Sequence, residues 1–284
     1  MKIIKADVLG YCMGVKRAVD SAEKALEERQ NQQKVYTLGP LIHNPDLMSS
    51  LEKRGASILK PEDINQLDSN SVVIIRAHGT TPQILNEINE KKAIVIDSTC
   101  PRVHSSQNRA SKYAEMGFQI IIAGDKNHGE VTSISGYSKG HSVVIQNAKE
   151  AESLNVEEKA VLISQTTFSM EEFDRIEKIL RARNSQLVVF NSICPATRER
   201  QNALRSLENQ AEGILVIGGK QSANTRRLYE IALSICRNAA LIENAADIPE
   251  EFKNLETVAL TAGASTPDSV IDEVEKALLS YSKN

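Results

Sequence analysis

Three cysteines at nearly equal spacing are the feature that most constrains this 284-residue chain. Cys12, Cys100 and Cys194 stand about 90 residues apart, and each follows a short apolar run typical of a strand buried on both faces of a parallel sheet. Proline follows two of them, at Pro101 and Pro195, where a first helical residue needs no N–H partner. Equivalent cysteines of a threefold repeat can meet at one central axis. The spacing therefore predicts a thiol site drawn from the whole chain.

Two further strand ends recur in each third of the sequence, about 30 and about 70 residues beyond the cysteine. Each repeat reads as strand, cysteine and helix, followed by two strand-loop-helix segments; helices are predicted over 82–91, 170–183 and 268–279. We therefore predict an α/β fold of three pseudo-repeated domains, each with a small parallel sheet. The first domain spans 1–100 with the N-terminal strand and Cys12, the second spans 101–193, and the third spans 194–284 with the C-terminal helix.

The loops at these strand ends carry the polar residues. In open parallel sheets, ligands bind beyond the carboxyl ends of the strands, in loops that open helices. His43, His78 and His128 occupy such loops and can donate hydrogen bonds to phosphate oxygens. Glu130 is the one carboxylic acid placed among them to deliver a proton. Four arginines near the same strands receive no role: Arg76, Arg102, Arg198 and Arg200.

Composition and charge exclude several classes of protein. The 34 basic and 37 acidic residues leave a net charge of −3, without the strongly basic face of a general nucleic-acid binder. No signal peptide and no run of 18 apolar residues is present, so we expect a cytoplasmic protein with no membrane or nucleic-acid partner. The fourth cysteine, Cys236, lies in an apolar helical pattern without a counterpart in the other repeats, and we interpret it as a core residue.

The nature of a three-thiol site is left open by the cysteines alone. Three thiolates are able to hold either zinc or an iron–sulfur cluster. A cluster with three cysteine ligands leaves one iron open as a Lewis-acid position for substrate, while a catalytic zinc site also uses three protein ligands. The alternatives are a non-enzymatic iron–sulfur redox sensor, a zinc hydrolase and a hydratase of the aconitase type.

Nine short motifs, in order and at matching spacings, resemble the LytB family of 4-hydroxy-3-methylbut-2-enyl diphosphate reductases from Ile3 to about Leu279. They are Gly10-Tyr11-Cys12-Met13-Gly14-Val15, Ile42-His43-Asn44, Arg76-Ala77-His78-Gly79, Asp97-Ser98-Thr99-Cys100-Pro101, His128-Gly129-Glu130, Gln165-Thr166-Thr167, Ile193-Cys194-Pro195-Ala196-Thr197, Gly219-Lys220-Gln221-Ser222-Ala223-Asn224 and Thr261-Ala262-Gly263-Ala264-Ser265.

The resemblance implies a trefoil of three α/β domains around one central 4Fe–4S cluster, held by Cys12, Cys100 and Cys194. It also implies catalytic roles for Glu130, Thr166 and His128, in which Thr166 assists Glu130 as proton donor. The implied substrate-binding residues are His43, His78, His128, Thr166, Ser222, Asn224 and Ser265.

The implied reaction is the last step of the non-mevalonate isoprenoid pathway. The allylic substrate (E)-4-hydroxy-3-methylbut-2-enyl diphosphate would lose its hydroxyl by reductive dehydroxylation to give isopentenyl and dimethylallyl diphosphates. Reduced ferredoxin or flavodoxin would supply the electrons. One residue departs from the family pattern: many members carry a second serine where this chain has Ala223, so one hydroxyl contact to the diphosphate is lost.

Overall fold

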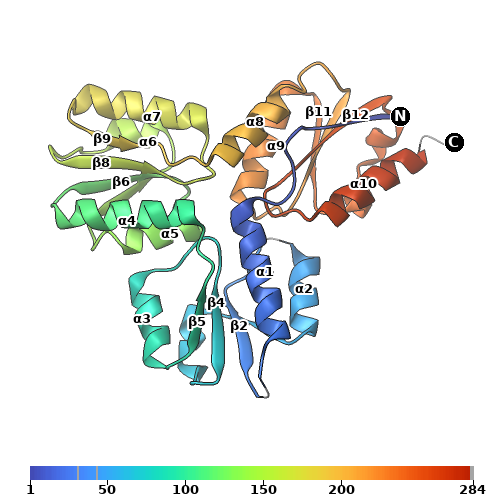
Figure 1. The fold of residues 1–284 in the computed structure, drawn as a ribbon. Coiled ribbons are helices and arrows are strands. Elements are labelled where there is room, and N and C mark those ends of the chain that lie inside the picture. Colours follow the sequence, from blue (N-terminus) through green and yellow to red (C-terminus); the bar gives the residue numbers. More distant parts are fainter. Residues whose placement is uncertain (31, 43, 282–284) are drawn as a thin grey trace. The chain divides into compact units, whose positions relative to one another are not determined.

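The computed structural model describes residues 1–30, 32–42 and 44–281, which form three four-stranded parallel sheets with flanking helices (Figure 1). The strands are β1 (Lys2–Lys5), β2 (Lys34–Leu38), β3 (Ala56–Leu59), β4 (Ser71–Ile75), β5 (Ile94–Asp97), β6 (Gln119–Ala123), β7 (Ser142–Ile145), β8 (Ala160–Ser164), β9 (Val188–Phe190), β10 (Gly213–Ile217), β11 (Asn238–Ile242) and β12 (Thr257–Ala262). The α-helices are α1 (Met13–Glu27), α2 (Pro45–Lys53), α3 (Pro82–Glu90), α4 (Pro101–Glu115), α5 (Gly129–Gly136), α6 (Ala148–Ser153), α7 (Met170–Arg183), α8 (Pro195–Arg205), α9 (Ala223–Ile235) and α10 (Asp268–Tyr281). The predicted helices over 82–91, 170–183 and 268–279 correspond to α3, α7 and α10.

All three sheets share one strand order. Read from equivalent edges they are β3-β2-β4-β5, β7-β6-β8-β9 and β11-β10-β12-β1. The prediction of an α/β fold with three small parallel sheets is therefore confirmed. It missed the fourth strand of each sheet, β3, β7 or β11, because these short edge strands carry no cysteine or polar loop to mark them.

The strand that precedes each cysteine lies at a sheet edge, as β1, β5 or β9. These strands are half-exposed, so the expectation that they are buried on both faces was wrong. An edge strand is flanked by one neighbour only, and its short apolar run covers the margin of the core.

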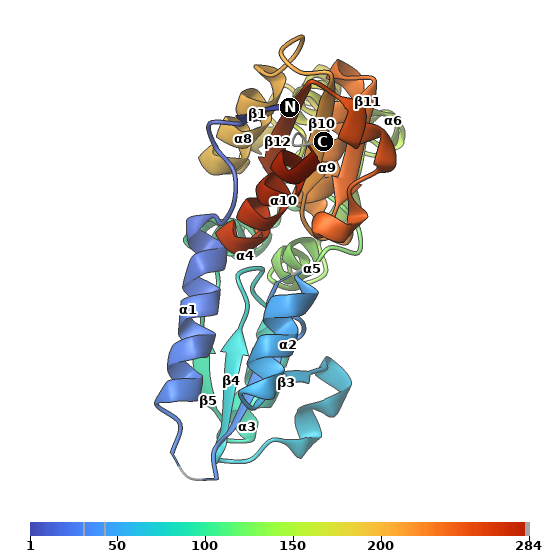
Figure 2. The same ribbon diagram turned by 90° about the vertical axis from the view of Figure 1, so that its right-hand side faces the viewer.

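The N-terminal strand corrects the predicted content of the first domain. β1 pairs with β12, in the register Ile3 opposite Val258, and so belongs to the sheet of the third repeat (Figure 2). That sheet receives only β10, β11 and β12 from its own stretch of chain. β1 supplies its fourth strand and pairs the edge of β12 that would otherwise present open backbone groups. Where the boundaries between the three repeats fall stays a prediction.

The chain divides into two compact units. The C-terminal unit comprises Met1–Val15, Ile42–Pro45 and Pro195–Asn284, with the sheet that contains β10, β11, β12 and β1. The central unit comprises Lys16–Leu41 and Asp46–Cys194, with the other two sheets. None of the described helices is both long and apolar enough to cross a membrane.

Alternating side chains build an apolar layer on each face of the β6–β9 sheet. Ile121 and Leu162 pack with Phe173 of α7 on one face, whereas Ile120 packs with Ile134 of α5 on the other. Successive residues of a strand point to opposite faces, so β6 contributes to both layers. With both faces covered, the polar loops of this sheet are confined to the ends of its strands.

Candidate active site

The three repeated cysteines occupy equivalent backbone positions. Each N–H donates to a carbonyl two residues beyond the end of the neighbouring strand: Cys12 to Ala264 at 3.0 Å, Cys100 to Ala77 at 3.0 Å, and Cys194 to Thr166 at 2.9 Å. Each cysteine directly precedes a helix, namely α1, α4 or α8, and each is half-buried and outside any disulfide. The three cysteines that recur in the sequence therefore also share one backbone hydrogen bond to the neighbouring strand's loop.

This setting suits three thiolates. A helix N-terminus favours negative charge, and thiolate sulfur is the ligand of zinc and of iron–sulfur clusters. The described residues contain no group of three or more histidine, cysteine, aspartate or glutamate side chains gathered as for a single metal ion. Cys12 belongs to the C-terminal unit, whereas Cys100 and Cys194 belong to the central unit. A site shared by all three thiols therefore stays a prediction.

Glu130 and Thr166 form a buried pair in the central unit. The Thr166 N–H donates to Glu130 Oε1 and the Thr166 hydroxyl donates to Oε2, both at 2.7 Å. The Glu130 residue is only 1% exposed, and this burial raises the pKa of its carboxyl from 4.5 to about 7. The two hydrogen bonds from Thr166 oppose the rise, while the charge of Asp125 adds to it. Burial is the largest cause of the raised pKa.

Gln165 joins the two loops that carry this pair. Its buried side chain accepts a hydrogen bond from the Asp125 N–H at 2.8 Å and donates to Thr167 Oγ1 at 2.9 Å. Gly124 permits this contact, because a Cβ there would lie 2.9 Å from Gln165 Oε1. Two hydrogen bonds between residues about 40 positions apart in sequence, Asp125 with Gln165 and Glu130 with Thr166, therefore join the two loops.

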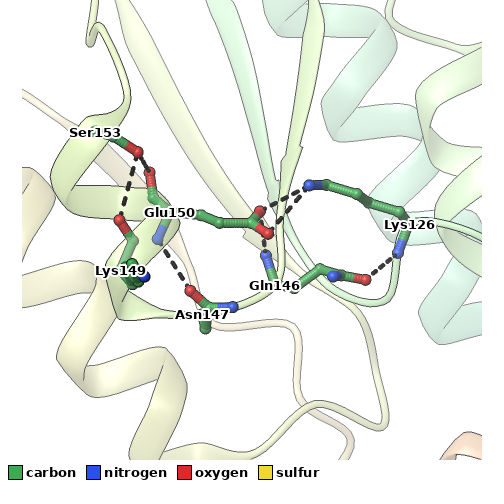
Figure 3. A network of polar contacts seen from close by, with 6 residues as sticks. All are labelled: Lys126, Gln146, Asn147, Lys149, Glu150 and Ser153. Atoms are coloured by element: carbon green, nitrogen blue, oxygen red, sulfur yellow. Dashed lines mark hydrogen bonds and ion pairs between the residues drawn. The ribbon is translucent and has the colours of Figure 1, made fainter.

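An exposed network anchors the start of the same loop (Figure 3). The Lys126 N–H donates to Gln146 Oε1 at 3.1 Å, and Lys126 Nζ lies 3.0 Å from Glu150 Oε2. The same carboxylate accepts from the Gln146 N–H, and the side-chain hydrogen bond from Lys126 lowers the pKa of Glu150. These contacts tie the residue two positions before His128 to the end of β7 and to α6.

Two of the predicted histidines lie in contact. The rings of His78 and His128 are 4.8 Å apart between centroids and meet edge to face. His128 is the N-cap of α5, where its Nδ1 accepts a hydrogen bond from the Glu130 N–H at 3.2 Å. Because Nδ1 is the acceptor, the proton of the neutral ring lies on Nε2, which is therefore a hydrogen-bond donor.

A buried relay of side chains holds the loop that carries His78. Gln107 Nε2 donates to Ser133 Oγ at 2.6 Å, and that hydroxyl donates to the Thr80 carbonyl at 3.1 Å. Gly79, with φ at +72°, lies against both side chains, so a Cβ there would collide with them. Gln107 and Ser133 were not predicted as site residues, because only their helical positions give a local signal in the sequence.

The predicted ligands of the C-terminal unit are buried polar groups. Ser222 is the N-cap of α9 and accepts from the Thr225 N–H at 3.4 Å. Asn224 Nδ2 and Ser265 Oγ are buried and make no hydrogen bond to the described residues. Buried donors without a partner are costly, and they indicate a place where a ligand completes the bonding. His43, another predicted ligand, lies outside the described residues.

The family model described as LytB protein matches residues 3–279. The chain belongs to the LytB family. It is 48% identical to the 4-hydroxy-3-methylbut-2-enyl diphosphate reductase of Treponema denticola, over 98% of this chain and 99% of that protein. The structure of the E-1-hydroxy-2-methyl-but-2-enyl-4-diphosphate reductase from Plasmodium falciparum is similar with a TM-score of 0.89 and 29% identity, covering 97% of this chain and 86% of that one.

A second solved LytB-family relative is (E)-4-hydroxy-3-methyl-but-2-enyl diphosphate reductase, described as the terminal enzyme of the non-mevalonate pathway. It aligns with a TM-score of 0.70 and 35% identity, over 99% of this chain and all of that one. The resemblance drawn from nine motifs is thereby confirmed for the family and for its three-sheet architecture. The roles of individual residues stay predictions.

Proposed function

We propose that this LytB-family chain is a 4-hydroxy-3-methylbut-2-enyl diphosphate reductase that forms isopentenyl and dimethylallyl diphosphates. The observation that carries the proposal is the buried pair of Glu130 and Thr166, in which the Glu130 carboxyl has a pKa of about 7. The relatives of this chain are named as this reductase. Substrate and two electrons combine with two protons, the allylic C–O bond breaks, a C–H bond forms, and water leaves.

The cofactor we propose is one 4Fe–4S cluster held by Cys12, Cys100 and Cys194. The donor set fits, because all three are thiols outside any disulfide that directly precede helices and make the same backbone hydrogen bond. When bound, such a cluster supplies electrons one at a time and offers a Lewis-acid position at its iron without a protein ligand. We propose reduced ferredoxin or flavodoxin as the electron donor and the cytoplasm as the location of the reaction.

Glu130 is the proton donor in this proposal. At a pH near 7 about half of the molecules carry a proton on this carboxyl, since its pKa is about 7. When Glu130 is protonated, the hydrogen bond between Oε2 and the Thr166 hydroxyl would reverse, so that Oε2 donates to the hydroxyl. The hydroxyl would then donate its own proton to the leaving hydroxyl, which extends the reach of the acid by one residue. A positioned general acid contributes roughly 10²–10⁴-fold to such a step.

The diphosphate is bound mostly by neutral donors. His78 and His128 Nε2 would contribute from the central unit, and Ser222, Asn224 and Ser265 from the C-terminal unit. The unpaired Asn224 Nδ2 and Ser265 Oγ support this assignment. A phosphate oxygen that accepts from each of them removes the cost of leaving these buried donors without a partner.

The test is an anaerobic assay of the reconstituted protein with the allylic diphosphate and a reduced viologen dye. We expect dye oxidation that depends on substrate, with two electrons consumed per molecule, and both five-carbon diphosphates as products. A protein that holds iron but oxidises no dye with this substrate would overturn the reductase and favour the sensor. Products without electron consumption would favour a hydratase.

A further inference from the structure

A cavity of about 270 Å³ in the central unit surrounds a side chain to which the reaction so far gives no role. Arg76 follows β4 and is half-buried at this cavity, together with Gly39, Pro61, Thr80 and Thr132. Its guanidinium makes one hydrogen bond to the described residues, from Nη1 to the Pro40 carbonyl at 3.3 Å. Since a guanidinium has five N–H donors, most of them are left for a ligand.

Two glycines form the slot in which the guanidinium lies. A Cβ on Gly129 would stand 2.5 Å from Arg76 Nη2, and a Cβ on Gly39 would stand 3.4 Å from Nη1. Gly129 separates His128 from Glu130, so the cation lies against the backbone of the loop that carries both. The same imagined Cβ is 3.7 Å from His78 Cβ. Arg76 is thus adjacent to the candidate catalytic residues.

Arg76 is the one charged side chain among the described residues that line this cavity. None of the described residues that line it is acidic, and no carboxylate forms an ion pair with Arg76 in the described part of the chain. Two helices begin at it, α3 with Thr81 as its N-cap and α5 with Gly129 as its first residue. Both helix N-termini carry partial positive charge, and in Figures 1 and 2 α5 lies over the end of β4.

Partial burial lowers the pKa of Arg76, because desolvation disfavours the charged form of the guanidinium. A guanidinium beside the N-termini of two helices is suited to binding a tetrahedral oxyanion. An anion in the cavity would neutralise the charge and use the remaining donors.

We propose that this cavity is an oxyanion site in which Arg76 binds a phosphate group of the allylic diphosphate. The oxyanion site follows from the cavity itself, whereas the identity of its ligand rests on the proposed function. Arg76 is in this view a substrate-positioning residue, and its planar fork makes it distinct from the neutral histidine, serine and asparagine donors.

The first experiment measures binding of inorganic diphosphate and of the allylic substrate to the reconstituted protein by anaerobic calorimetry. In Arg76→Gln we expect both affinities to fall roughly ten- to a hundred-fold, the range for a charge-assisted hydrogen bond. Arg76→Lys keeps the charge without the fork and should lie between. The matched control is Arg183→Gln, which removes an exposed arginine that also donates to backbone carbonyls, and it should bind both ligands as wild type does.

A second variant moves the guanidinium without removing it. Gly129→Ala places a Cβ against the flexible end of Arg76, at a position in the first turn of α5 where alanine is favourable. We expect it to fold and to weaken diphosphate binding. In the Arg76→Gln background the same change should have little further effect, because the group on which it acts is gone.

The outcomes separate the two proposals. If folded Arg76→Gln binds inorganic diphosphate as tightly as wild type, or if Gly129→Ala weakens binding equally in both backgrounds, the oxyanion site is overturned. If wild type binds inorganic diphosphate through Arg76 but neither binds nor reduces the allylic substrate, the proposed function fails and the oxyanion site stands, with free diphosphate as its ligand.

Discussion

The candidate proton donor and the candidate diphosphate ligands of the C-terminal unit differ in how their polar atoms are satisfied. Both oxygens of Glu130 accept hydrogen bonds from Thr166, whereas Asn224 Nδ2 and Ser265 Oγ are buried without a partner among the described residues. The first set is complete before any ligand arrives. The second set is complete only when a ligand supplies acceptors, which is the difference expected between a group that holds a proton and groups that bind an anion.

The thiols give the largest expected effect. Cys100→Ser in the central unit should abolish cluster binding and all turnover, because a hydroxyl is a poor ligand for the iron of the proposed cluster. Iron content and visible absorption after anaerobic reconstitution measure this. Cys236→Ser is the control: Cys236 packs against the core of the C-terminal unit and its Sγ lies 3.6 Å from the Glu212 carbonyl. Loss of the cluster in that control would contradict the assignment.

Glu130→Gln should give the next largest effect. The amide preserves the shape of the side chain but cannot deliver the proton, so we expect turnover to fall by about two to four orders of magnitude. Single-turnover rates at matched cluster content are the measurement, with calorimetry to show that substrate still binds. A rate within a few-fold of wild type would remove Glu130 from the reaction.

The pH dependence should follow the raised pKa of Glu130. Above about pH 7 the carboxyl loses its proton, so the rate of the protonation step should fall about tenfold per pH unit. Stability follows the same group: the folded protein binds more protons than the unfolded chain between pH 4.5 and about 7, so the free energy of unfolding decreases as the pH rises through this window. The total change is roughly 3 kcal/mol at most.

Urea unfolding across this pH window, compared between wild type and Glu130→Gln, checks the linkage. The variant should lack the part of the pH dependence that Glu130 causes. Equal slopes in the two proteins would show that this carboxyl does not titrate in that window.

The unpaired donors Asn224 and Ser265 should give the smallest effect on substrate binding. Removing the Ser265 hydroxyl should also change the free energy of unfolding in the opposite direction to removing the Thr166 hydroxyl. Ser265→Ala or Asn224→Ala should weaken substrate binding about tenfold, since each would remove one of the proposed hydrogen bonds to the phosphate. In the absence of substrate, Ser265→Ala should leave the protein as stable or raise the free energy of unfolding by about 1 kcal/mol, because it removes a buried hydroxyl without a partner. Thr166→Val, which removes a satisfied hydroxyl, should lower stability. The same sign in both variants would contradict the comparison.

Much of the fold and of the site could be predicted from local sequence. The cysteine repeat, the apolar strands and the polar loops at their ends are patterns of neighbouring residues, and they identified α7 and Glu130 without any knowledge of pairing. Thr166 came from the family motif, and the structure has it hydrogen-bonded to Glu130. Local patterns suffice here because the chain repeats one α/β plan three times.

The tertiary structure decided everything that depends on distant partners. The pairing of β1 with β12 joins the two ends of the sequence, and nothing in the composition of Lys2–Lys5 specifies that partner over a closer one. The burial of Glu130 depends on how distant segments pack around it, which local sequence does not specify. This burial raises the pKa of its carboxyl. Arg76 received no role from the sequence, since the glycine slot and the cavity around it are built by segments brought together in space. Periodicity determines which residues are strand, helix and loop, whereas burial and electrostatics depend on contacts between segments far apart in the chain.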